Sequence, residues 1–339
     1  MATRIAINGF GRIGRLVFRN LMEEITDGVE VVALNDVAPL DNLAYLLRHD
    51  SIQPTPTDTL ISVRDHRLVW NDRQIRYSQI TEPEELPWDE AEIDLVIESS
   101  GHFTSETEAK KHLDAGARRV LISAPAKGDI LTLSLGVNEE FYDPGEHFII
   151  SNASCTTNAL APVAKVLDDN FGIVQGALTT VHAYTNSQTL VDGPSKKWRR
   201  GRSAAHNIVP TTTGAAIATT KVLPQLKGKM DGMAIRVPVL AGSIIDFVAT
   251  TREEVTIDSV NRAFHEASRT NKLGGILGIT NEELVSSDII ASPFSSLVDA
   301  NSTMTFGNHM VKVLSWYDNE WAYARRTAEL ARYLTNPPS

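Results

Sequence analysis

Residues 4–14 read RIAINGFGRIG and contain the pattern that decides the fold. The apolar run over 4–8 predicts a short buried strand, and the apolar residues over 16–25 recur at helical spacing. Between them stand Gly9, Gly11 and Gly14. In such a turn the first glycine permits a tight bend, the second lets the backbone approach a pyrophosphate, and the third lets helix and strand pack closely. The stretch therefore predicts the strand, turn and helix of a dinucleotide-binding domain.

An acidic residue follows the next strand. Residues 29–34 (VEVVAL) have the continuous apolar character of a strand that is covered on both faces, and Asp36 comes directly after it. A carboxylate at this place accepts a hydrogen bond from a ribose 2′-hydroxyl and repels a 2′-phosphate, which favours NAD over NADP. A glycine pattern alone is a weak signal, and Asn35-Asp36 taken alone could be a simple cap. The combination with the strand and helix predicts a cofactor site.

The rest of the chain predicts two domains. Three short segments over 58–80 indicate an antiparallel excursion, after which 93–98 and 120–123 resume the parallel sheet. From Gly172 the strands are longer and the helices fewer. We expect an α/β Rossmann-type doubly wound parallel sheet domain plus an α+β catalytic domain with a mostly antiparallel sheet. The first spans 1–154 and is completed by a C-terminal helix at 319–339, and the second spans 155–318.

Composition excludes several classes of protein. The 339 residues include 32 basic and 42 acidic ones, and the net charge of −10 opposes general affinity for nucleic acid or an anionic membrane. No apolar stretch approaches the length of a membrane span, and the N-terminus lacks a secretory signal. A single cysteine allows no internal disulfide and fits a reducing compartment. We expect a cytoplasmic protein that needs no metal.

That cysteine, Cys155, lies in the stretch SNASCTTN (151–158). A lone cysteine is most often a small buried hydrophobe. Here its neighbours are polar and a helical apolar stripe begins directly after it, so it is expected at a helix N-terminus, where amides and the helix dipole lower the pKa of a thiol. A nucleophilic thiol needs a base beside it, and His182, at the end of the strand over 178–181, is the candidate. Sequence spacing alone leaves their pairing open.

Six motifs in order resemble those of the phosphorylating glyceraldehyde-3-phosphate dehydrogenases, over essentially the whole chain. They are INGFGRIGR (7–15), SNASCTTN (151–158), HAYTN (182–186), PTTTGAA (210–216), RVP (236–238) and WYDNEW (316–321). The resemblance implies a glycolytic oxidoreductase that converts D-glyceraldehyde 3-phosphate, NAD and inorganic phosphate to 1,3-bisphosphoglycerate. Cys155 would attack the aldehyde to form a thiohemiacetal and then a thioester, with His182 as ion-pair partner and general base. A homotetramer is usual in the family.

The resemblance also implies a set of binding residues. Those for substrate and phosphate are Ser154, Thr156, Thr185, Arg200, Thr213, Gly214 and Arg236. Those for the cofactor are Gly9, Phe10, Gly11, Arg12, Ile13, Gly14, Asp36, Ser123, Asn319 and Tyr323, with the Asn319 amide holding the nicotinamide carboxamide.

The sequence departs from the family pattern at several places. Ala159 replaces the second cysteine that many members carry. Ser187 stands where the family usually has an aspartate beside the substrate-phosphate site, and this predicts altered affinity for that phosphate. Gly193 replaces a leucine common in NAD-specific members and leaves room for some use of NADP.

Two alternatives remain open from the sequence. An erythrose-4-phosphate dehydrogenase would share the cysteine and glycine motifs, but it usually departs from the tyrosine-threonine-asparagine and TTTG segments that this chain keeps. A non-catalytic dinucleotide-binding protein would be expected to have lost at least one of Cys155, His182, Arg236 and Asn319.

Overall fold

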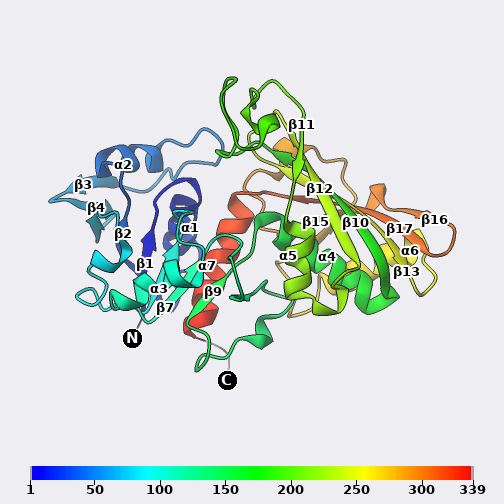
Figure 1. Cartoon of the computed structure of the whole chain (residues 1–339), viewed down its shortest axis with the longest axis horizontal. Coiled ribbons are helices and arrows are strands. Elements are labelled where there is room, and N and C mark those ends of the chain that lie inside the picture. The colour runs from blue at the N-terminus through cyan, green and yellow to red at the C-terminus, as the bar shows by residue number, and fades with distance from the viewer. Residues whose placement is uncertain (1, 337–339) are drawn as a thin grey trace. The chain divides into compact units, whose positions relative to one another are not determined.

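The computed structural model describes residues 2–336, which form two compact units. One consists of residues 2–133, 140–153 and 324–336, and the other of residues 134–139 and 154–323. Each unit is built on a β-sheet of its own (Figure 1).

The first unit contains a nine-stranded sheet in the order β3-β4-β5-β2-β1-β6-β7-β9-β8. Its strands are β1 Thr3–Asn8, β2 Val29–Asn35, β3 Ile61–Arg64, β4 Arg67–Trp70, β5 Arg73–Ser78, β6 Leu95–Glu98, β7 Arg119–Ile122, β8 Leu131–Thr132 and β9 Ile149–Ser151. Neighbours from β5 to β8 run parallel, whereas β3, β4 and β5 pair antiparallel. The predicted parallel sheet and its antiparallel excursion are confirmed.

Helices lie between the strands of the first unit and after its last strand. They are α1 Arg12–Glu23, α2 Leu40–Arg48, α3 Glu106–Asp114 and most of α7 Trp321–Thr335. Ser105 and Glu108 close a capping box at the start of α3. The Asp318 carboxylate accepts from the amides of Glu320 and Trp321 and so caps α7. The predicted helix at 319–339 is therefore α7, and residues 337–339 lie outside the described part of the chain.

The order of the strands reverses at β1. β1 pairs on one edge with β2, the next strand in the sequence, and on its other edge with β6. The strands that follow β1 are therefore added first on one side of it and later on the other side. In open α/β sheets ligands bind at the carboxyl ends of the strands beside such a switch point. The Gly9–Gly14 turn follows β1 at this place and the segment 99–101 follows β6.

The second unit contains an eight-stranded mixed sheet in the order β11-β12-β10-β13-β17-β15-β14, with β16 paired to β17. Its strands are β10 Ile173–Ala183, β11 Val209–Thr212, β12 Met230–Val237, β13 Ser243–Thr251, β14 Leu277–Thr280, β15 Ser296–Asp299, β16 Met304–Phe306 and β17 Met310–Tyr317. Pairing is antiparallel except for β10 with β12 and β14 with β15. This matches the expected mostly antiparallel sheet.

Helices α4 Cys155–Phe171, α5 Ala215–Val222 and α6 Ile257–Ala267 share one core with the sheet of the second unit. Every second residue of β13 is buried in this unit, whereas Ile244, Asp246 and Val248 between them are only half-buried. Helix α5 begins only at Ala215, because the consecutive threonines before it favour the extended strand β11. The short 3-10 turns are η1 Pro83–Glu85, η2 Glu139–Phe141, η3 Trp198–Gly201, η4 Pro224–Leu226, η5 Ser286–Ile289 and η6 Ala300–Ser302.

Candidate active site

Cys155 is the first residue of α4, where the sequence predicts it. Ser154 precedes it in an extended conformation, and its hydroxyl accepts a hydrogen bond from the amide of Thr157 at 3.0 Å. The residue before, Ala153, has a positive φ of 54°, an uncommon conformation for alanine, and its amide donates to the Ser151 hydroxyl at 3.0 Å. A sharp turn and a capped helix thus place the thiol at the positive end of the α4 dipole.

His182 lies directly beside this thiol. It is the penultimate residue of β10, and its Nε2 is 3.4 Å from the Cys155 Sγ. The imidazole is buried and the cysteine is partly exposed. The structure therefore brings together the two residues that sequence spacing could not pair.

The tautomer of His182 follows from its other contacts. Its Nδ1 is 2.6 Å from the carbonyl oxygen of Ala183, which can only accept a hydrogen bond. The Arg236 guanidinium lies 3.0 Å from the same Nδ1, and it also donates to the Ala183 carbonyl at 2.8 Å. We assign the proton of neutral His182 to Nδ1. The Nδ1–H group and the Arg236 guanidinium then both donate to the Ala183 carbonyl oxygen. The Nε2 lone pair then faces the thiol and can take its proton.

Burial and Arg236 set the charges of the pair. Burial raises the pKa of the Cys155 thiol, and the Arg236 charge, the Thr156 hydroxyl and the amides at the start of α4 oppose this. Burial, assisted by Arg236, lowers the pKa of His182 to about 3. His182 is thus neutral at pH 7 and is suited to act as a base.

A buried tyrosine supports the pair from behind. The Tyr317 hydroxyl is 2.9 Å from the hydroxyls of both Thr156 and Thr180, and its ring meets the edge of the His182 imidazole with centroids 5.9 Å apart. Burial raises the pKa of this phenol, so it stays protonated and donates to one threonine while accepting from the other. Sequence reasoning assigned Tyr317 no role, although it stands within the motif at 316–321.

Two arginines lie near the end of β10. Arg236 contacts Thr185 at 3.4 Å, and its Nε is buried without a partner among the described residues. Arg200 contacts the hydroxyl of Thr211 at 3.0 Å and that of Ser187 at 3.4 Å. Ser187 in turn lies 2.9 Å from the Thr185 hydroxyl. Guanidinium groups and hydroxyls are the donors that hold phosphate oxygens.

The remaining predicted anion ligands differ in their surroundings. Gly214 is exposed at the start of α5, and a side chain there would meet no atom within 4 Å. Thr213 is half-buried, and its hydroxyl accepts from the amide of Ala215 at 3.2 Å. Thr156 is buried and bonded to Tyr317, which favours support of the thiol over contact with phosphate.

Comparison with known proteins agrees with this geometry. Residues 3–106 match the family model described as glyceraldehyde 3-phosphate dehydrogenase, NAD binding domain, and residues 154–319 match the C-terminal domain of the same enzyme. The chain is 50% identical over 336 residues to the glyceraldehyde-3-phosphate dehydrogenases of Streptomyces coelicolor and Geobacillus stearothermophilus, covering 99% of each chain. It is 50% identical over 334 residues to glyceraldehyde-3-phosphate dehydrogenase 1 of Bacillus subtilis, covering 98% of both chains.

The chain belongs to the glyceraldehyde-3-phosphate dehydrogenase family. The sequence-based predictions of the family, its fold class, its enzyme class and its cofactor NAD are confirmed.

The first unit fits the NAD of this family. Gly9 has a φ of +89°, and a side chain there would come within 2.4 Å of the Ser100 amide nitrogen. A side chain on Gly14 would come within 2.0 Å of the Gly9 carbonyl oxygen, whereas one on Gly11 would meet nothing within 4 Å. The first amides of α1 have no acceptors within the helix and can hold a pyrophosphate. Gly9 and Gly14 thus have the structural roles that the sequence predicts, and the approach of a pyrophosphate to Gly11 stays a prediction.

Two other predicted cofactor residues, Phe10 and Arg12, have side chains that contact the protein itself. The Phe10 side chain is buried against Phe18, and its amide donates to the Asp36 carboxylate at 2.6 Å. Phe10 therefore supports the turn from inside. The Arg12 side chain forms an ion pair with Asp50 at 2.9 Å, and Arg12 and Ile13 supply amides at the start of α1.

The remaining cofactor candidates of the family lie in different units. Ser123, in the first unit, contacts the Ser99 hydroxyl at 3.0 Å. Asn319 and Tyr323 are buried in the second unit. The Asn319 Oδ1 accepts from the Ser243 hydroxyl at 2.8 Å, which fixes the orientation of its amide.

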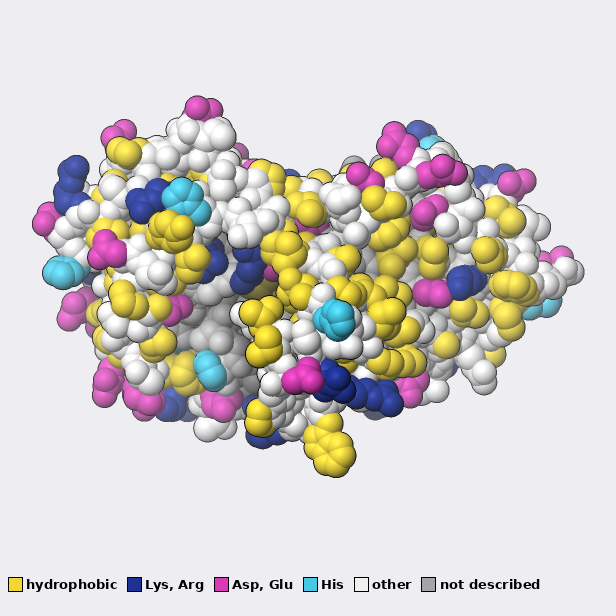
Figure 2. Space-filling view, turned by 90° about the horizontal axis from the view of Figure 1, so that it is seen from above, with side chains coloured by type: hydrophobic (Ala, Val, Ile, Leu, Met, Phe, Trp, Pro, Cys, Tyr) yellow, Lys and Arg dark blue, Asp and Glu magenta, His cyan; other side chains and the backbone are white. Residues whose placement is uncertain are grey.

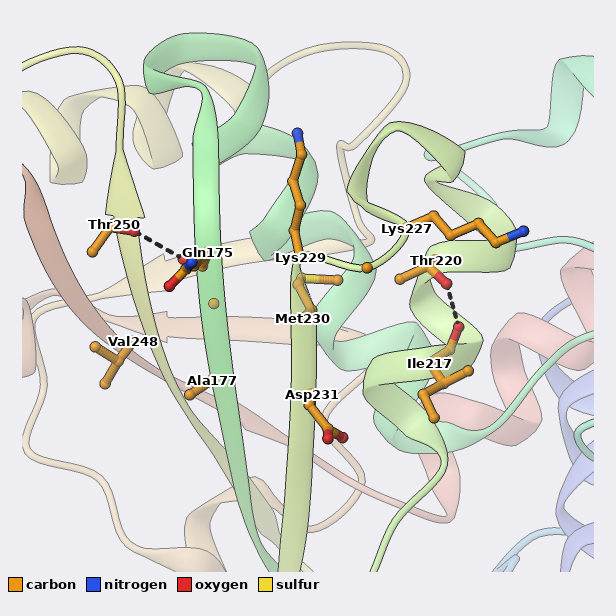
Figure 3. A pocket seen from close by; sticks show the side chains of 12 residues that line it. Gln175, Ala177, Ile217, Thr220, Lys227, Lys229, Met230, Asp231, Val248 and Thr250 are labelled. Carbon is orange, nitrogen blue, oxygen red and sulfur yellow. Dashed lines mark hydrogen bonds between the residues drawn. The ribbon is translucent and has the colours of Figure 1, made fainter.

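A separate pocket lies elsewhere in the second unit. It has a volume of about 640 Å³ and is bounded by β10, β12, β13 and α5, with Gln175, Lys229, Asp231 and Val248 among its lining residues (Figure 3). None of the predicted site residues lines this pocket. Within residues 2–336, no three His, Cys, Asp or Glu side chains gather closely enough to hold a metal ion.

Proposed function

We propose that this protein catalyses the phosphorylating oxidation of D-glyceraldehyde 3-phosphate to 1,3-bisphosphoglycerate, with NAD as the hydride acceptor. Family membership supports the reaction, and the Cys155–His182 contact of 3.4 Å supports the assignment of the chemistry to these residues.

Cys155 is the proposed nucleophile. His182 Nε2 takes the thiol proton as the sulfur attacks the aldehyde carbon and returns it to the aldehyde oxygen, so that the product is a thiohemiacetal and His182 is neutral again. His182 then accepts the proton of the thiohemiacetal hydroxyl, since its Nδ1 is held by Ala183 and only Nε2 faces the reacting atoms. Bound NAD supplies the hydride acceptor, so that the thiohemiacetal carbon is oxidised to a thioester. Inorganic phosphate attacks the thioester carbonyl and releases the free thiol.

The binding roles are proposed in two groups. Thr185, Arg236 and Arg200 lie together and are suited to the phosphate of the substrate. Ser154, Thr213 and Gly214 are proposed for the attacking phosphate. The residues proposed for NAD are those of the glycine turn, Asp36 and Ser123, and the family resemblance implies Asn319 for the nicotinamide carboxamide.

The test measures absorbance at 340 nm when the protein is mixed with NAD, phosphate and glyceraldehyde 3-phosphate. We expect NADH to form, and Cys155→Ser to abolish turnover while NAD binding persists. Erythrose 4-phosphate in place of the substrate, and NADP in place of NAD, should each give a kcat/KM at least tenfold lower. Folded protein without a signal would contradict the proposed reaction.

We also propose that the protein assembles as a homotetramer in the cytoplasm. Hydrophobic side chains form broad patches on the face shown in Figure 2. Large exposed hydrophobic residues in the second unit include Leu190, Val191, Trp198, Ile208 and Leu240. Patches of this kind mark association sites. A lone cysteine fits a reducing compartment, and no helix in the described part of the chain is long and apolar enough to cross a membrane.

A further inference from the structure

The first unit buries a carboxylate beside Asn8, the residue that precedes the Gly9–Gly14 turn. Glu98 is the last residue of β6 and is 1% exposed. Its Oε1 accepts from the amide of Ser100 at 2.7 Å and from the Ser100 hydroxyl at 2.5 Å. Its Oε2 accepts from the Asn8 amide group at 2.5 Å and contacts His112 Nε2 at 3.0 Å. These contacts use both oxygens and hold the charge by hydrogen bonds, which is what a buried carboxylate requires.

The protonation of His112 is fixed by a tryptophan. The Trp88 indole nitrogen lies 3.0 Å from His112 Nδ1, and an indole N–H can only donate. Nδ1 therefore accepts, and the proton of the imidazole is on Nε2, where it donates to Glu98. Both rings are fully buried. His112 is thus a neutral donor that anchors the carboxylate to α3.

Glu98 connects the two segments that follow β1 and β6. Asn8 immediately precedes Gly9, and Ser100 lies against Gly9 so closely that a side chain on this glycine would come within 2.4 Å of the Ser100 amide nitrogen. The Glu98 carboxylate therefore binds Asn8, which precedes the glycine turn, and Ser100, which packs against Gly9. Ser123 extends the contacts, since its hydroxyl donates to the Glu98 backbone carbonyl at 3.0 Å.

The connection continues to β2, the strand that ends directly before Asp36. Asn8 Oδ1 accepts from the Asn35 amide group at 2.7 Å, and Asn35 also contacts Ile80 through its amide nitrogen at 2.9 Å and its amide oxygen at 3.0 Å. The side chains from Asn35 through Asn8 and Glu98 to His112 thus form one buried chain of hydrogen bonds across the carboxyl ends of β2, β1 and β6.

We propose that Glu98 is a positioning residue for NAD, which it serves by holding the Gly9–Gly14 turn and the 99–101 segment at a fixed separation. The carboxylate contacts no ligand itself. This inference rests on the proposed function, because it concerns the cofactor of that reaction. The two held segments lie at the switch point, where a cofactor approaches the backbone most closely. Loss of the carboxylate is expected to weaken NAD binding and to leave the cysteine chemistry of the second unit unchanged.

The decisive variant is Glu98→Gln. An amide group replaces one acceptor by a donor, and every partner of Glu98 donates, so one contact becomes repulsive whichever way the amide turns. His112 cannot reverse its tautomer while Trp88 donates to it. We expect the Kd for NAD, measured by titration calorimetry, to rise about tenfold or more. KM for NAD should rise in parallel, and kcat at saturating NAD should stay within about threefold.

A matched control is Glu84→Gln, which makes the same chemical change on an exposed carboxylate paired with Lys111. It should leave the Kd for NAD unchanged. Ser100→Ala is a milder variant that removes one donor from the segment after β6 and is expected to fold. It should raise the Kd about threefold.

The readouts separate this proposal from the proposed function. The rate of Cys155 alkylation by iodoacetamide without NAD reports the second unit and should not change in Glu98→Gln. Unchanged Kd values in folded Glu98→Gln and Ser100→Ala, or a fall in kcat with an unchanged Kd, would overturn the positioning role. Wild-type protein that binds NAD but forms no NADH would instead overturn the reaction.

Discussion

Arg236 influences both partners of the reactive pair. Its guanidinium lies 3.0 Å from His182 Nδ1, and its charge lowers the pKa of His182 and opposes the rise that burial causes in the pKa of Cys155. A positive charge thus favours thiolate and disfavours imidazolium. The sequence predicts Arg236 only as a phosphate ligand, and the structure adds this electrostatic effect.

The first prediction tests that effect with Arg236→Gln. Because His182 is neutral, the main consequence should be a higher thiol pKa and a smaller thiolate fraction. Alkylation of Cys155 by iodoacetamide at pH 7 should slow several-fold. Arg202→Gln, at an exposed arginine paired with Asp192, is the control and should react like the wild type. Faster alkylation of Arg236→Gln would show that an imidazolium balances the thiolate.

The pH dependence of alkylation gives a second prediction. The pKa of Cys155 is raised, so the thiolate fraction and the alkylation rate should increase as pH rises from 7 to 10. The pKa of His182 is about 3, so this residue should stay neutral from pH 5 upward and cause no step near pH 6.5. A rate that is flat above pH 7, with a step near 6.5, would be inconsistent with a neutral pair.

Ser187 leads to a third prediction, about substrate affinity. It lies 2.9 Å from the Thr185 hydroxyl and 3.4 Å from Arg200, at the proposed site of the substrate phosphate. In Ser187→Asp, a carboxylate would pair with Arg200 and change the charge available to the phosphate. KM for glyceraldehyde 3-phosphate should change several-fold, with kcat nearly constant. Ser287→Asp, on an exposed serine, is the control. An unchanged KM would exclude Ser187 from the site.

At the scale of the element, Ser154 has two roles at the start of α4. It caps the helix through the Thr157 amide, and it is a proposed ligand of the attacking phosphate. Comparison of two variants can separate the roles, because glycine is a nearly adequate cap and alanine is a poor one.

We predict that Ser154→Ala lowers the free energy of unfolding by about 1 kcal/mol and that Ser154→Gly lowers it by only a few tenths. Both variants lose the hydroxyl, so both should raise KM for phosphate by a similar factor. Chemical denaturation and phosphate titration give the two quantities. A KM that rises only in the alanine variant would assign Ser154 to the helix alone.

At the scale of the whole molecule, we predict that the less buried face of the second sheet contacts a second copy of the chain. Val248 and Leu314 are half-buried on this face, with an Asp246–Lys312 ion pair of 2.7 Å between their strands. The Trp316 indole nitrogen is buried on β17 without a partner among the described residues. Such a face is suited to an interface between copies.

Val248→Arg should therefore shift the assembly to smaller species, because it replaces an apolar side chain of this face by a long, unpaired positive charge. Sedimentation velocity at several protein concentrations measures the change. Val285→Arg, at an exposed valine of the same unit, should sediment as the wild type does. An unchanged tetramer in Val248→Arg would exclude this face from the interface.

The sequence predicts what depends on local pattern. Strand, glycine turn and helix follow from residues 4–25, and the position of Cys155 at a helix start follows from its neighbours. Contacts between distant segments have no local signal. Tyr317 meets Thr156 across 161 positions, and the Glu98–His112 contact depends on how α3 packs on the sheet. Such pairs become visible only once the strand order is known.

The bond between Asp36 and the amide of Phe10 limits how the cofactor preference of this protein can be redesigned. The carboxylate that we propose to discriminate against a 2′-phosphate also fixes the turn proposed to hold the pyrophosphate. An exchange of Asp36 for alanine would remove the repulsion and loosen that turn in the same step. A successful change to NADP therefore needs a neutral side chain that still accepts from this amide, such as asparagine or serine, before any arginine is introduced nearby.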